Sequence, residues 1–441
     1  MPELPRVVVT GLGVVSPLGP LPAFWERLCA GATGIVPIDA FDPGPGAPRR
    51  GACVRDWEPK EHIPAAELRR MDRFSRLVVT ACRTALADAA LALDAPGAEA
   101  TGLVFGTAFG NLSESEEFLR GLFAKGPARA NPLTFPNLVL NAPTGYAAID
   151  LGLRGPSFAI THGEASGEAA LAAAYDTIVC GQTQVVLAGG GDELPHILFQ
   201  VYKDLGVLSP HGTTRGGRRR VGRRAGAVPA EEGREWSSPF ARARNGFVMG
   251  EGVAMLVLES GVHAHTRGAR VYAELVGHAS ESVPSSPHDW PHPDGAPPVA
   301  TARQLAALGW VPRAETSHDE GREARADLAI SCANSTPHLD AYESSRLTRL
   351  LGDASARVLV TSLKGAIGDF GGAGALAAAA AVLALHNGRV PPLAALDEPD
   401  PDCTLRLATP GTASPAGGFA HALVSASPRG GGCLTLLFRR P

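Results

Sequence analysis

The sequence predicts an α/β fold made of two similar halves. Short runs rich in β-branched residues alternate along the 441-residue chain with helical patterns rich in alanine and leucine. The same order of strands and helices restarts after Glu259, which indicates an internal duplication. We therefore expect an N-terminal half over residues 1–259 and a C-terminal half over residues 260–441. With 45% hydrophobic and 19% charged residues, the chain has the apolar side chains needed for a large core.

The first half contains four expected strands with helices between them. Each strand is a β-rich run bounded by glycine or a polar turn residue. The clearest helical pattern between strands covers residues 69–91. The expected strands are "RVVVTGLG" from residue 6, "GLVFGTAFG" from residue 102, "SFAITHG" from residue 157 and "QVVLAGGGDE" from residue 184.

The second half repeats this alternation and adds a helix of small apolar residues. Residues 373–385 form a 13-residue apolar run, whereas a membrane span needs about 20 residues. We therefore predict a buried helix, closed by Asn387 and Gly388 as its C-cap. The other expected elements are strands "RVYAELVGHASES", "DLAISCAN" and "VLVTSLKGAIGD", with helices over residues 300–308 and 340–351.

Composition excludes several classes of protein. A formal net charge of −4 gives no basic bias, so we expect no nucleic-acid partner. The seven cysteines are scattered and form no CxxC pair, which argues against a disulfide framework and a zinc site and favours the cytoplasm. The amino terminus enters a β-branched run at once and reads as a first strand rather than a signal peptide, and we expect no membrane partner.

A glycine pair at the start of the chain could suggest a dinucleotide site. Gly11 and Gly13 follow a strand, as in that fingerprint. Ser16 stands where the third glycine belongs, however, and Pro17 and Pro22 interrupt the helix that should follow. We expect no cofactor.

Two polar segments interrupt the regular pattern. Residues 211–236 carry six arginines between Arg215 and Arg224 among glycines, which predicts a solvated loop, with a docking patch for an acidic partner as the alternative. Residues 281–298 bring together His288, Asp289, His292 and Asp294 in a proline-rich run. No helix or strand fixes these side chains, so we expect a surface loop and no metal site.

Residues 160–171, "ITHGEASGEAAL", have the pattern of a strand, a glycine-flanked turn and a helix of small residues. A helix amino terminus reached in this way is a usual setting for a nucleophile, because it lowers a thiol's pKa. The residue at the turn is instead Glu164. The scaffold of an active site is therefore predicted without its expected nucleophile.

Six motifs spread over the chain resemble the β-ketoacyl synthases of fatty-acid and polyketide assembly. Their order and spacing cover nearly the whole chain, so the resemblance is specific. The motifs are "VVVTGLGVVSPLG" ending at residue 19, "GLRGPS" at 152–157, "VVLAGGGDE" at 185–193, "GFVMGEGVAMLVLE" at 246–259, "NSTPHLDAYE" at 334–343 and "SLKGAIGDFGGAGALAA" at 362–378.

The resemblance implies a thiolase-like fold of two duplicated α/β halves that form a layered α-β-α-β-α core and work as a dimer. It also implies a cysteine nucleophile and two histidines that assist decarboxylation of a malonyl thioester. The cysteine position of the family's pattern falls on Glu164, and the histidine positions fall on Cys332 and Asp369, while Lys364 is retained. The glycine-rich loop reads "SASPRGGGC" at residues 425–433 where active members resemble "NSFGFGGTN".

These departures predict no catalytic residue. A carboxylate is a poor group for thioester exchange, and an aspartate repels the negative charge that decarboxylation develops. Three alternatives remain open at this stage: Glu164 as a general base, Cys332 as a relocated nucleophile, and His162 beside the turn as a catalyst. The non-catalytic interpretations are, in the same order, an ionised carboxylate at a helix terminus, a packed apolar side chain and a hydrogen-bonded core histidine.

Chain-length factors, the ketosynthase beta subunits of type II polyketide synthases, resemble this chain in keeping the fold and losing the cysteine. The resemblance implies pairing with an active ketosynthase, contact with acyl carrier protein, and a role in chain length. Most such proteins carry glutamine at the position of Glu164. A malonyl-carrier-protein decarboxylase and a carrier-protein-binding scaffold without length control are the alternatives.

The resemblance also assigns two regions of the chain to the dimer. Residues 110–123 and 135–152 would line the acyl tunnel, with a helix beginning near Ser113 that places four tunnel candidates at helical spacing. The resemblance implies that the strand before the turn pairs across the two-fold axis, and such an apolar edge is an aggregation hazard if it is left unpaired. The tunnel candidates are Ser115, Phe118, Leu119 and Leu122, and the interface candidates are Ser157, Phe158, Ala159, Ile160 and Thr161.

Overall fold

The computed structural model describes residues 4–210, 235–312, 326–415 and 417–441. Within these ranges one twelve-stranded mixed sheet has the order β12-β11-β10-β13-β14-β9-β1-β8-β7-β5-β6, with β2 beside β1, and β3 and β4 form a separate pair. The strands are β1 (Val7–Ser16), β2 (Gly19–Pro20), β3 (Ile35–Pro37), β4 (Arg50–Ala52), β5 (Thr101–Gly106), β6 (Ser157–Ile160), β7 (Val185–Asp192), β8 (Gly252–Ser260), β9 (Ala273–Ser282), β10 (Ala326–Ile330), β11 (Leu359–Thr361), β12 (Arg406–Leu407), β13 (Phe419–Ala426) and β14 (Gly432–Arg439).

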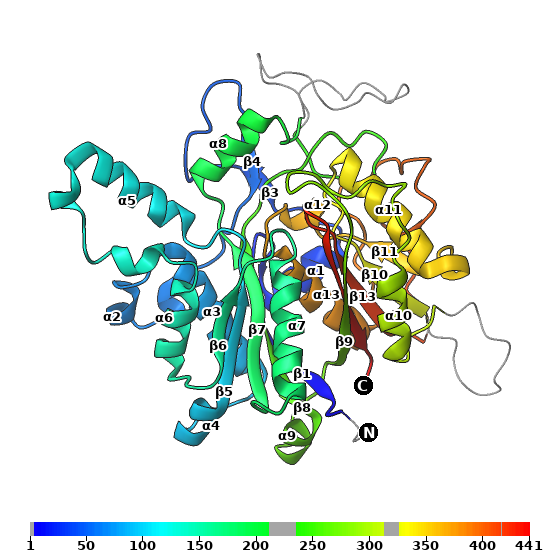
Figure 1. The fold of residues 1–441 in the computed structure, drawn as a ribbon, viewed down its shortest axis with the longest axis horizontal. Coiled ribbons are helices and arrows are strands. Elements are labelled where there is room, and N and C mark those ends of the chain that lie inside the picture. Colours follow the sequence, from blue (N-terminus) through cyan, green and yellow to red (C-terminus); the bar gives the residue numbers. More distant parts are fainter. Residues whose placement is uncertain (1–3, 211–234, 313–325, 416) are drawn as a thin grey trace.

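The sheet has two arms, which in the strand order above run from β12 to β9 and from β1 to β6. Helices lie on the outer side of each arm and between the two arms (Figure 1). They are α1 (Leu21–Cys29), α2 (Ala65–Leu68), α3 (Arg73–Asp88), α4 (Ala95–Ala100), α5 (Leu112–Lys125), α6 (Ala142–Leu151), α7 (Ser166–Val179), α8 (His196–Leu205), α9 (Gly261–Thr266), α10 (Val299–Ala307), α11 (Pro337–Leu351), α12 (Lys364–Ile367) and α13 (Ala373–Asn387).

The elements form five layers. Helix α3 packs against one face of β1, β5, β7 and β8, while α10 and α11 cover β9 and the strands beyond it. Helices α7 and α13 fill the space between the two arms of the sheet. The expected thiolase-like α-β-α-β-α arrangement is confirmed, whereas the boundary near residue 260 stays a prediction.

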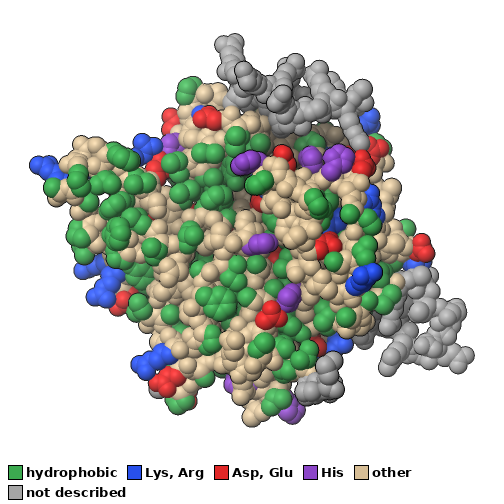
Figure 2. Space-filling model, in the orientation of Figure 1, with side chains coloured by type: hydrophobic (Ala, Val, Ile, Leu, Met, Phe, Trp, Pro, Cys, Tyr) green, Lys and Arg blue, Asp and Glu red, His purple; other side chains and the backbone are tan. Residues whose placement is uncertain are grey.

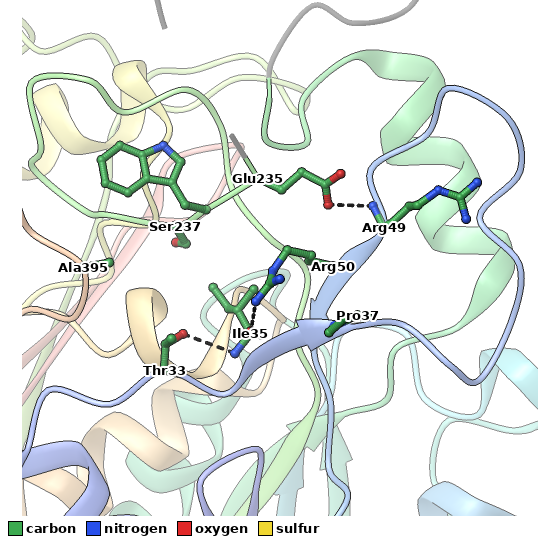
Figure 3. Close-up of a pocket in the computed structure, with 9 residues that line it drawn as sticks. Thr33, Ile35, Pro37, Arg49, Arg50, Glu235, Ser237 and Ala395 are labelled. Carbon is green, nitrogen blue, oxygen red and sulfur yellow. Dashed lines mark hydrogen bonds between the residues drawn. The ribbon is translucent and has the colours of Figure 1, made fainter. Parts of the chain in front are cut away.

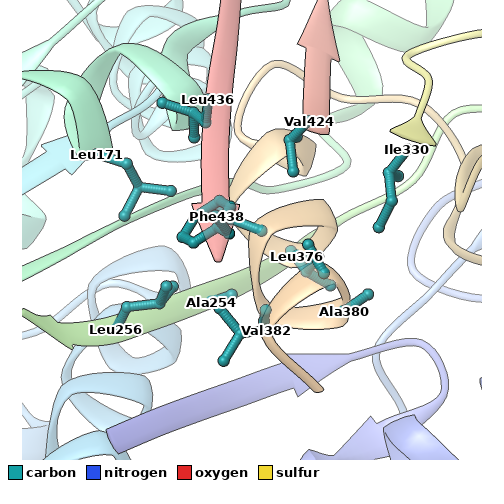
Figure 4. Close-up of a cluster of buried hydrophobic side chains, with 14 of the residues drawn as sticks. Leu171, Ala254, Leu256, Ile330, Leu376, Ala380, Val382, Val424, Leu436 and Phe438 are labelled. Carbon is teal, nitrogen blue, oxygen red and sulfur yellow. The ribbon is translucent and has the colours of Figure 1, made fainter. Parts of the chain in front are cut away.

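Helix α13 lies at the centre of the core. Its side chains meet Leu171 of α7, residues of β8 and residues of the C-terminal strands in one buried apolar cluster (Figure 4). The helix ends where Gly388 takes the left-handed conformation at φ 66°, as the C-cap prediction requires. Leu376 and Val382 are fully buried, so the helix is a core element.

Glycines allow the two central helices to approach the sheet closely. A Cβ on Gly372, just before α13, would lie 2.1 Å from the backbone nitrogen of Gly191 in β7. A Cβ on Gly106 of β5 would lie 1.9 Å from the carbonyl oxygen of Ser166 at the start of α7. Real side chains do not fit at such distances, so these two glycines allow backbone contact between helix and strand.

Two expected segments differ from the structure. The helical pattern over residues 69–91 yields α3 with shorter bounds, because the Asp72 carboxylate accepts the amide of Ser75 at 2.9 Å and caps the helix, and Ala90 takes a positive φ of 48° beyond its end. The segment 281–298 is not wholly a surface loop, since Trp290 inserts into the protein and is only 8% exposed. The arginine-rich stretch 215–224 lies outside the described residues.

One side of the molecule exposes large apolar side chains. They gather over α5 and α6, on the left of Figures 1 and 2, next to the edge strand β6. No helix within the described ranges is long and apolar enough to cross a membrane. The exposed set includes Leu119, Phe123, Leu133, Phe135, Val139, Leu140, Ile149 and Phe158.

Candidate functional site

The turn between β6 and α7 presents Glu164 at the helix amino terminus. Gly163 has a φ of 55°, a conformation that glycine adopts without strain. The Ser166 hydroxyl donates to the carbonyl of Gly163 at 2.7 Å and accepts the amide of His162 at 2.9 Å. The strand, turn and helix predicted from "ITHGEASGEAAL" are confirmed, and the serine fixes the turn.

Both carboxylate oxygens of Glu164 are occupied by one arginine. The Arg429 guanidinium donates to Oε1, and the Arg429 backbone amide donates to Oε2 at 3.1 Å. The Arg429 and Glu164 side chains are 17% and 19% exposed, respectively. The guanidinium lies over the Trp290 ring, 3.9 Å from its centroid, in a cation–π contact. To act as a general base, Glu164 would first have to break this pair.

Arg429 was not predicted as a site residue. It belongs to the loop of residues 427–431 that joins β13 to β14, which we call the strap. Glu164 and Arg429 are separated by 265 residues, so no sequence spacing relates them. The available signal was a lone arginine in the glycine-rich run "SPRGGG", where the family's pattern has a phenylalanine.

Cys332 lies just beyond the end of β10 and is a buried, packed thiol. It clusters with Trp290 and Leu339, and its sulfur accepts the backbone amide of Ser427 at 3.2 Å. Burial, reinforced by the charge of Glu343, raises the pKa of the Cys332 thiol well above its ordinary value. The thiolate needed for nucleophilic attack is therefore disfavoured, in agreement with the packed-hydrophobe interpretation.

Lys364 and Asp369 form a buried ion pair. The Nζ and Oδ1 atoms are 2.6 Å apart, and each side chain is 7% exposed. The Asn334 amide donates to the other oxygen of Asp369 at 2.7 Å. Burial alone would lower the pKa of Lys364, but the charge of Asp369 outweighs it and raises that pKa above its usual value. The cation is thus matched to Asp369 rather than to a substrate.

A further carboxylate, Glu168, was missed by the sequence reasoning. It lies on α7, one turn after Glu164, and is 2% exposed. Its carboxyl group fits against Gly374 of α13, where a Cβ in place of the glycine hydrogen would lie 1.9 Å from the Glu168 Cδ. Burial raises the pKa of Glu168 to about 7, while the charge of Lys364 opposes that shift. A charged residue within a helix of small residues was the signal in the sequence.

His162 is held at the start of β14, next to the strap. Its Nε2 atom lies 2.9 Å from the carbonyl oxygen of Gly432, and the side chain is exposed rather than part of the core. The contact bears out the hydrogen-bonded interpretation, although the histidine is not buried. The structure thus brings Glu164, His162 and the strap together.

The tunnel and interface candidates lie on the apolar side of the molecule. Ser115, Phe118 and Leu122 are half-buried, Leu119 is exposed, and no α5 side chain is fully buried. The Phe118 ring lies 6.1 Å from that of Phe135. The strand Ser157–Ile160 is the sheet's edge, and Thr161 follows it in an exposed position.

Two described cavities lie away from Glu164. One, of about 580 Å³, is lined by residues that include Arg49, Arg50 and Glu235 (Figure 3), with the Arg49 amide donating to Glu235 at 2.6 Å. The other, of about 860 Å³, is lined at α5 by Ser113 and charged residues and by none of the four tunnel candidates. Neither cavity includes a residue of α7 or of the strap.

Comparison with known families and proteins gives a consistent result. The family model for the β-ketoacyl synthase N-terminal domain matches residues 5–264, and the model for the C-terminal domain matches residues 322–397. The chain is 32% identical over 406 residues to 3-oxoacyl-(acyl-carrier-protein) synthase 2 of Synechocystis sp., covering 91% of each chain. It is 29% identical over 412 residues to the protein of that name from Staphylococcus aureus strain COL, covering 92% of each.

Solved structures agree with this result. The ishigamide ketosynthase/chain length factor superimposes with a TM-score of 0.83 at 25% identity and covers 100% of both chains. A β-ketoacyl synthase from Burkholderia phymatum STM815 superimposes with a TM-score of 0.80 at 25% identity, covering 99% of this chain and 100% of the other. The likeness extends over the whole chain in each case.

Proposed function

Because the chain belongs to the β-ketoacyl synthase family, we propose that it is a non-condensing subunit of a type II polyketide synthase that pairs with an active ketosynthase and helps to set polyketide or fatty-acyl chain length. The observation that carries the proposal is Glu164 at the family's cysteine position, with both carboxylate oxygens held by Arg429. A thiol nucleophile is absent there, and the carboxylate is already paired.

The other two positions support the same conclusion. Condensation needs groups that stabilise the negative charge formed on a thioester oxygen. At the positions of the family's histidines stand a buried thiol of raised pKa, Cys332, and an aspartate paired with Lys364. Neither offers an imidazole, and a carboxylate opposes the charge that must form.

Similarity to the ishigamide protein supports the more specific assignment. The name of that solved structure combines a ketosynthase with a chain length factor. The curated relatives named above carry the name of a condensing enzyme, 3-oxoacyl-(acyl-carrier-protein) synthase 2, so their names do not favour the non-condensing role. The degenerate positions of this chain therefore decide between the two roles in our proposal.

The uncovered apolar side supports a partner subunit. Strand β6 pairs with β5 on one side only, and its Phe158 side chain is 38% exposed. On α5 and α6, Phe123 is 83% exposed and Ile149 is 76% exposed. Contiguous apolar surface of this kind marks an interaction site. We propose that the active ketosynthase covers it, and that acyl carrier protein delivers substrate to the resulting complex.

Helix α5 is the proposed wall of the acyl tunnel in that complex. Its apolar positions have no full cover among the described residues of this chain, and Phe118 is braced by Phe135 from the following segment. A partner that covers β6 and α6 would also approach α5, because α6 packs beside β6 and α5 lies on the same side of the molecule as α6 (Figure 1). Ser115, with its small side chain, would leave space beside Phe118.

Incubation of the purified chain with malonyl- and acyl-carrier protein is expected to give no covalent adduct and no carbon dioxide. The physical reason is the absence of a thiolate and of both imidazoles. Intact-mass measurement and a carbon dioxide assay test this, with an active ketosynthase as the positive control. An acyl group mapped to Glu164 or Cys332 would contradict the proposal, and carbon dioxide release without an adduct would favour the decarboxylase alternative.

Replacing Glu164 with cysteine alone is expected to leave condensation undetectable. The variant gains a thiol but keeps Cys332 and the Lys364–Asp369 pair in place of the imidazoles. Condensation is measured with acyl- and malonyl-carrier protein against the same ketosynthase control. Turnover by the Glu164→Cys variant at a rate near that of the control would overturn the view that all three positions matter.

The chain is expected to form an obligate heterodimer with its ketosynthase. Obligate interfaces bury on the order of 2,000 Å² or more, and an uncovered edge strand invites aggregation. Co-expression followed by gel filtration and analytical ultracentrifugation measures this, with the chain expressed alone as the comparison. A monodisperse monomer at micromolar concentration that ignores the ketosynthase would count against the pairing.

A further inference from the structure

Two loops of the C-terminal half are joined above the amino terminus of α7. One is the strap, and the other is the segment 283–298, which carries Trp290. The amide of Val283 donates to the carbonyl of Gly431 at 2.8 Å. The amide of Gly430 lies 3.2 Å from the carbonyl oxygens of both Ser286 and Asp289. The two loops therefore form one hydrogen-bonded cover.

The ends of the strap are fixed independently of Glu164. At one end the Ser427 hydroxyl donates to Glu343 at 2.5 Å. Just beyond the other end, Gly432 at the start of β14 contacts His162. Between these anchors, Arg429 makes a second connection to the turn before α7, through its guanidinium and its backbone amide.

We propose that Glu164 and Arg429 form a latch that holds this cover closed, so that a thioester arm cannot reach the amino terminus of α7 in this subunit. The inference goes beyond the proposed function, because it concerns access to this chain's own site whether or not the chain sets product length. The residue at the nucleophile position thereby becomes a positioning residue for the cover.

The geometry of the latch makes it a strong contact between the cover and the turn. Two donors of one arginine meet the two oxygens of one carboxylate, an arrangement in which charge-assisted hydrogen bonds are strong. Both side chains are more than four-fifths buried, so solvent screens the pair weakly. The same guanidinium also lies on the Trp290 ring, so the ion pair fixes the arginine that contacts the tryptophan.

The protein contains its own reporter of opening. Cys332 packs beneath Trp290 and is 7% exposed. A closed cover shields this thiol from reagents, and an open cover exposes it. Cys82 in α3 is fully buried in a separate apolar cluster, whereas Cys180 is exposed. These two thiols provide matched internal controls for unfolding and for probe reactivity.

The test is the rate at which a pantetheine-linked iodoacetamide alkylates each cysteine of the full chain, purified with its ketosynthase if the two co-purify. Peptide mapping by mass spectrometry gives the rate for each thiol. In the wild type, Cys332 should react far more slowly than Cys180. Glu164→Ala and Arg429→Ala should each accelerate Cys332 by about tenfold, the equivalent of about 1.4 kcal/mol in the opening equilibrium.

Two further variants make the result decisive. The double variant Glu164→Ala, Arg429→Ala should react no faster at Cys332 than the single variants, because both changes remove the same pair. Glu164→Gln keeps the shape of the side chain but loses its charge, so it should also accelerate the labelling of Cys332. If Arg429→Ala also makes Cys82 reactive, that variant is unfolding, and the result for Glu164→Gln then decides whether the latch exists. Equal labelling of Cys332 in all folded variants, or labelling in the wild type as fast as Cys180, would overturn the latch.

Discussion

Replacing Ser115 with phenylalanine is expected to shorten the acyl products of the ketosynthase complex. Ser115 is half-buried on α5, with its hydroxyl bonded to the carbonyl of Asn111 at 3.0 Å. A ring added beside Phe118 would fill the space that a growing chain needs, because packed interiors have little slack. Product length, measured by mass spectrometry of the reconstituted complex, should shift to fewer condensations as the dominant species.

Two variants on the same helix make this result specific. Phe118→Ala should lengthen products if its ring, braced by Phe135, forms the tunnel floor. Ser113→Phe is the matched control, because a position two residues away points about 200° around the helix, and Ser113 is exposed. Unchanged products from both Ser115→Phe and Phe118→Ala, with pairing intact by gel filtration, would favour the scaffold alternative.

Replacing Glu168 with glutamine is expected to stabilise the protein at pH 8 relative to the wild type. The folded-state pKa of Glu168 is about 7 and its ordinary value is 4.5, so the native state holds the proton more tightly than the unfolded chain. The stability that this proton contributes is fully present below about pH 4.5 and is lost as the pH rises through 7. The loss amounts to about 3 kcal/mol.

The matched measurement is the difference between the two proteins at two pH values. Glutamine carries no titrating proton, so the advantage of Glu168→Gln in free energy of unfolding should grow by about 2 kcal/mol or more between pH 5 and pH 8. Charges facing Glu168 are Lys364, Glu343 and Asp369, which the variant leaves unchanged. Glu117→Gln on an exposed position of α5 is the control. A pH-independent difference would show that Glu168 ionises as a solvated carboxylate does.

The sequence predicted those helices and strands whose signal lies within one contiguous segment. The helix α13 and its glycine cap were predicted because a run of small apolar residues and an αL glycine are both visible in one segment. The limits of α3 were too wide because Asp72 is a cap, and capping residues look like any other surface aspartate in a long helical pattern. Strands β13 and β14 were not predicted, since the proline and glycines of the strap dominate the local pattern between them.

Positions in the site were predictable, whereas its contacts were not. The motifs assigned Glu164, Cys332, Asp369 and Lys364 to one site, because motif order reports which residues share a site, and their role there stays a prediction. Arg429 was identified as a site residue only from the structure, because an ion pair between residues 265 positions apart depends on how two distant loops meet. The ionisation of Glu168 likewise depends on burial against Gly374, which no local pattern encodes.

The position of α13 between the two arms of the sheet has a consequence for biosynthesis. Strand β7 ends at Asp192 and its inner face is covered by a helix that ends at Asn387. At about 5 to 20 residues per second, a ribosome takes roughly 10 to 40 seconds to make the intervening chain. During that interval the nascent N-terminal half exposes apolar surface to the cell. Chaperone binding and early proteolysis are therefore expected to act on this half before the C-terminal half completes the core.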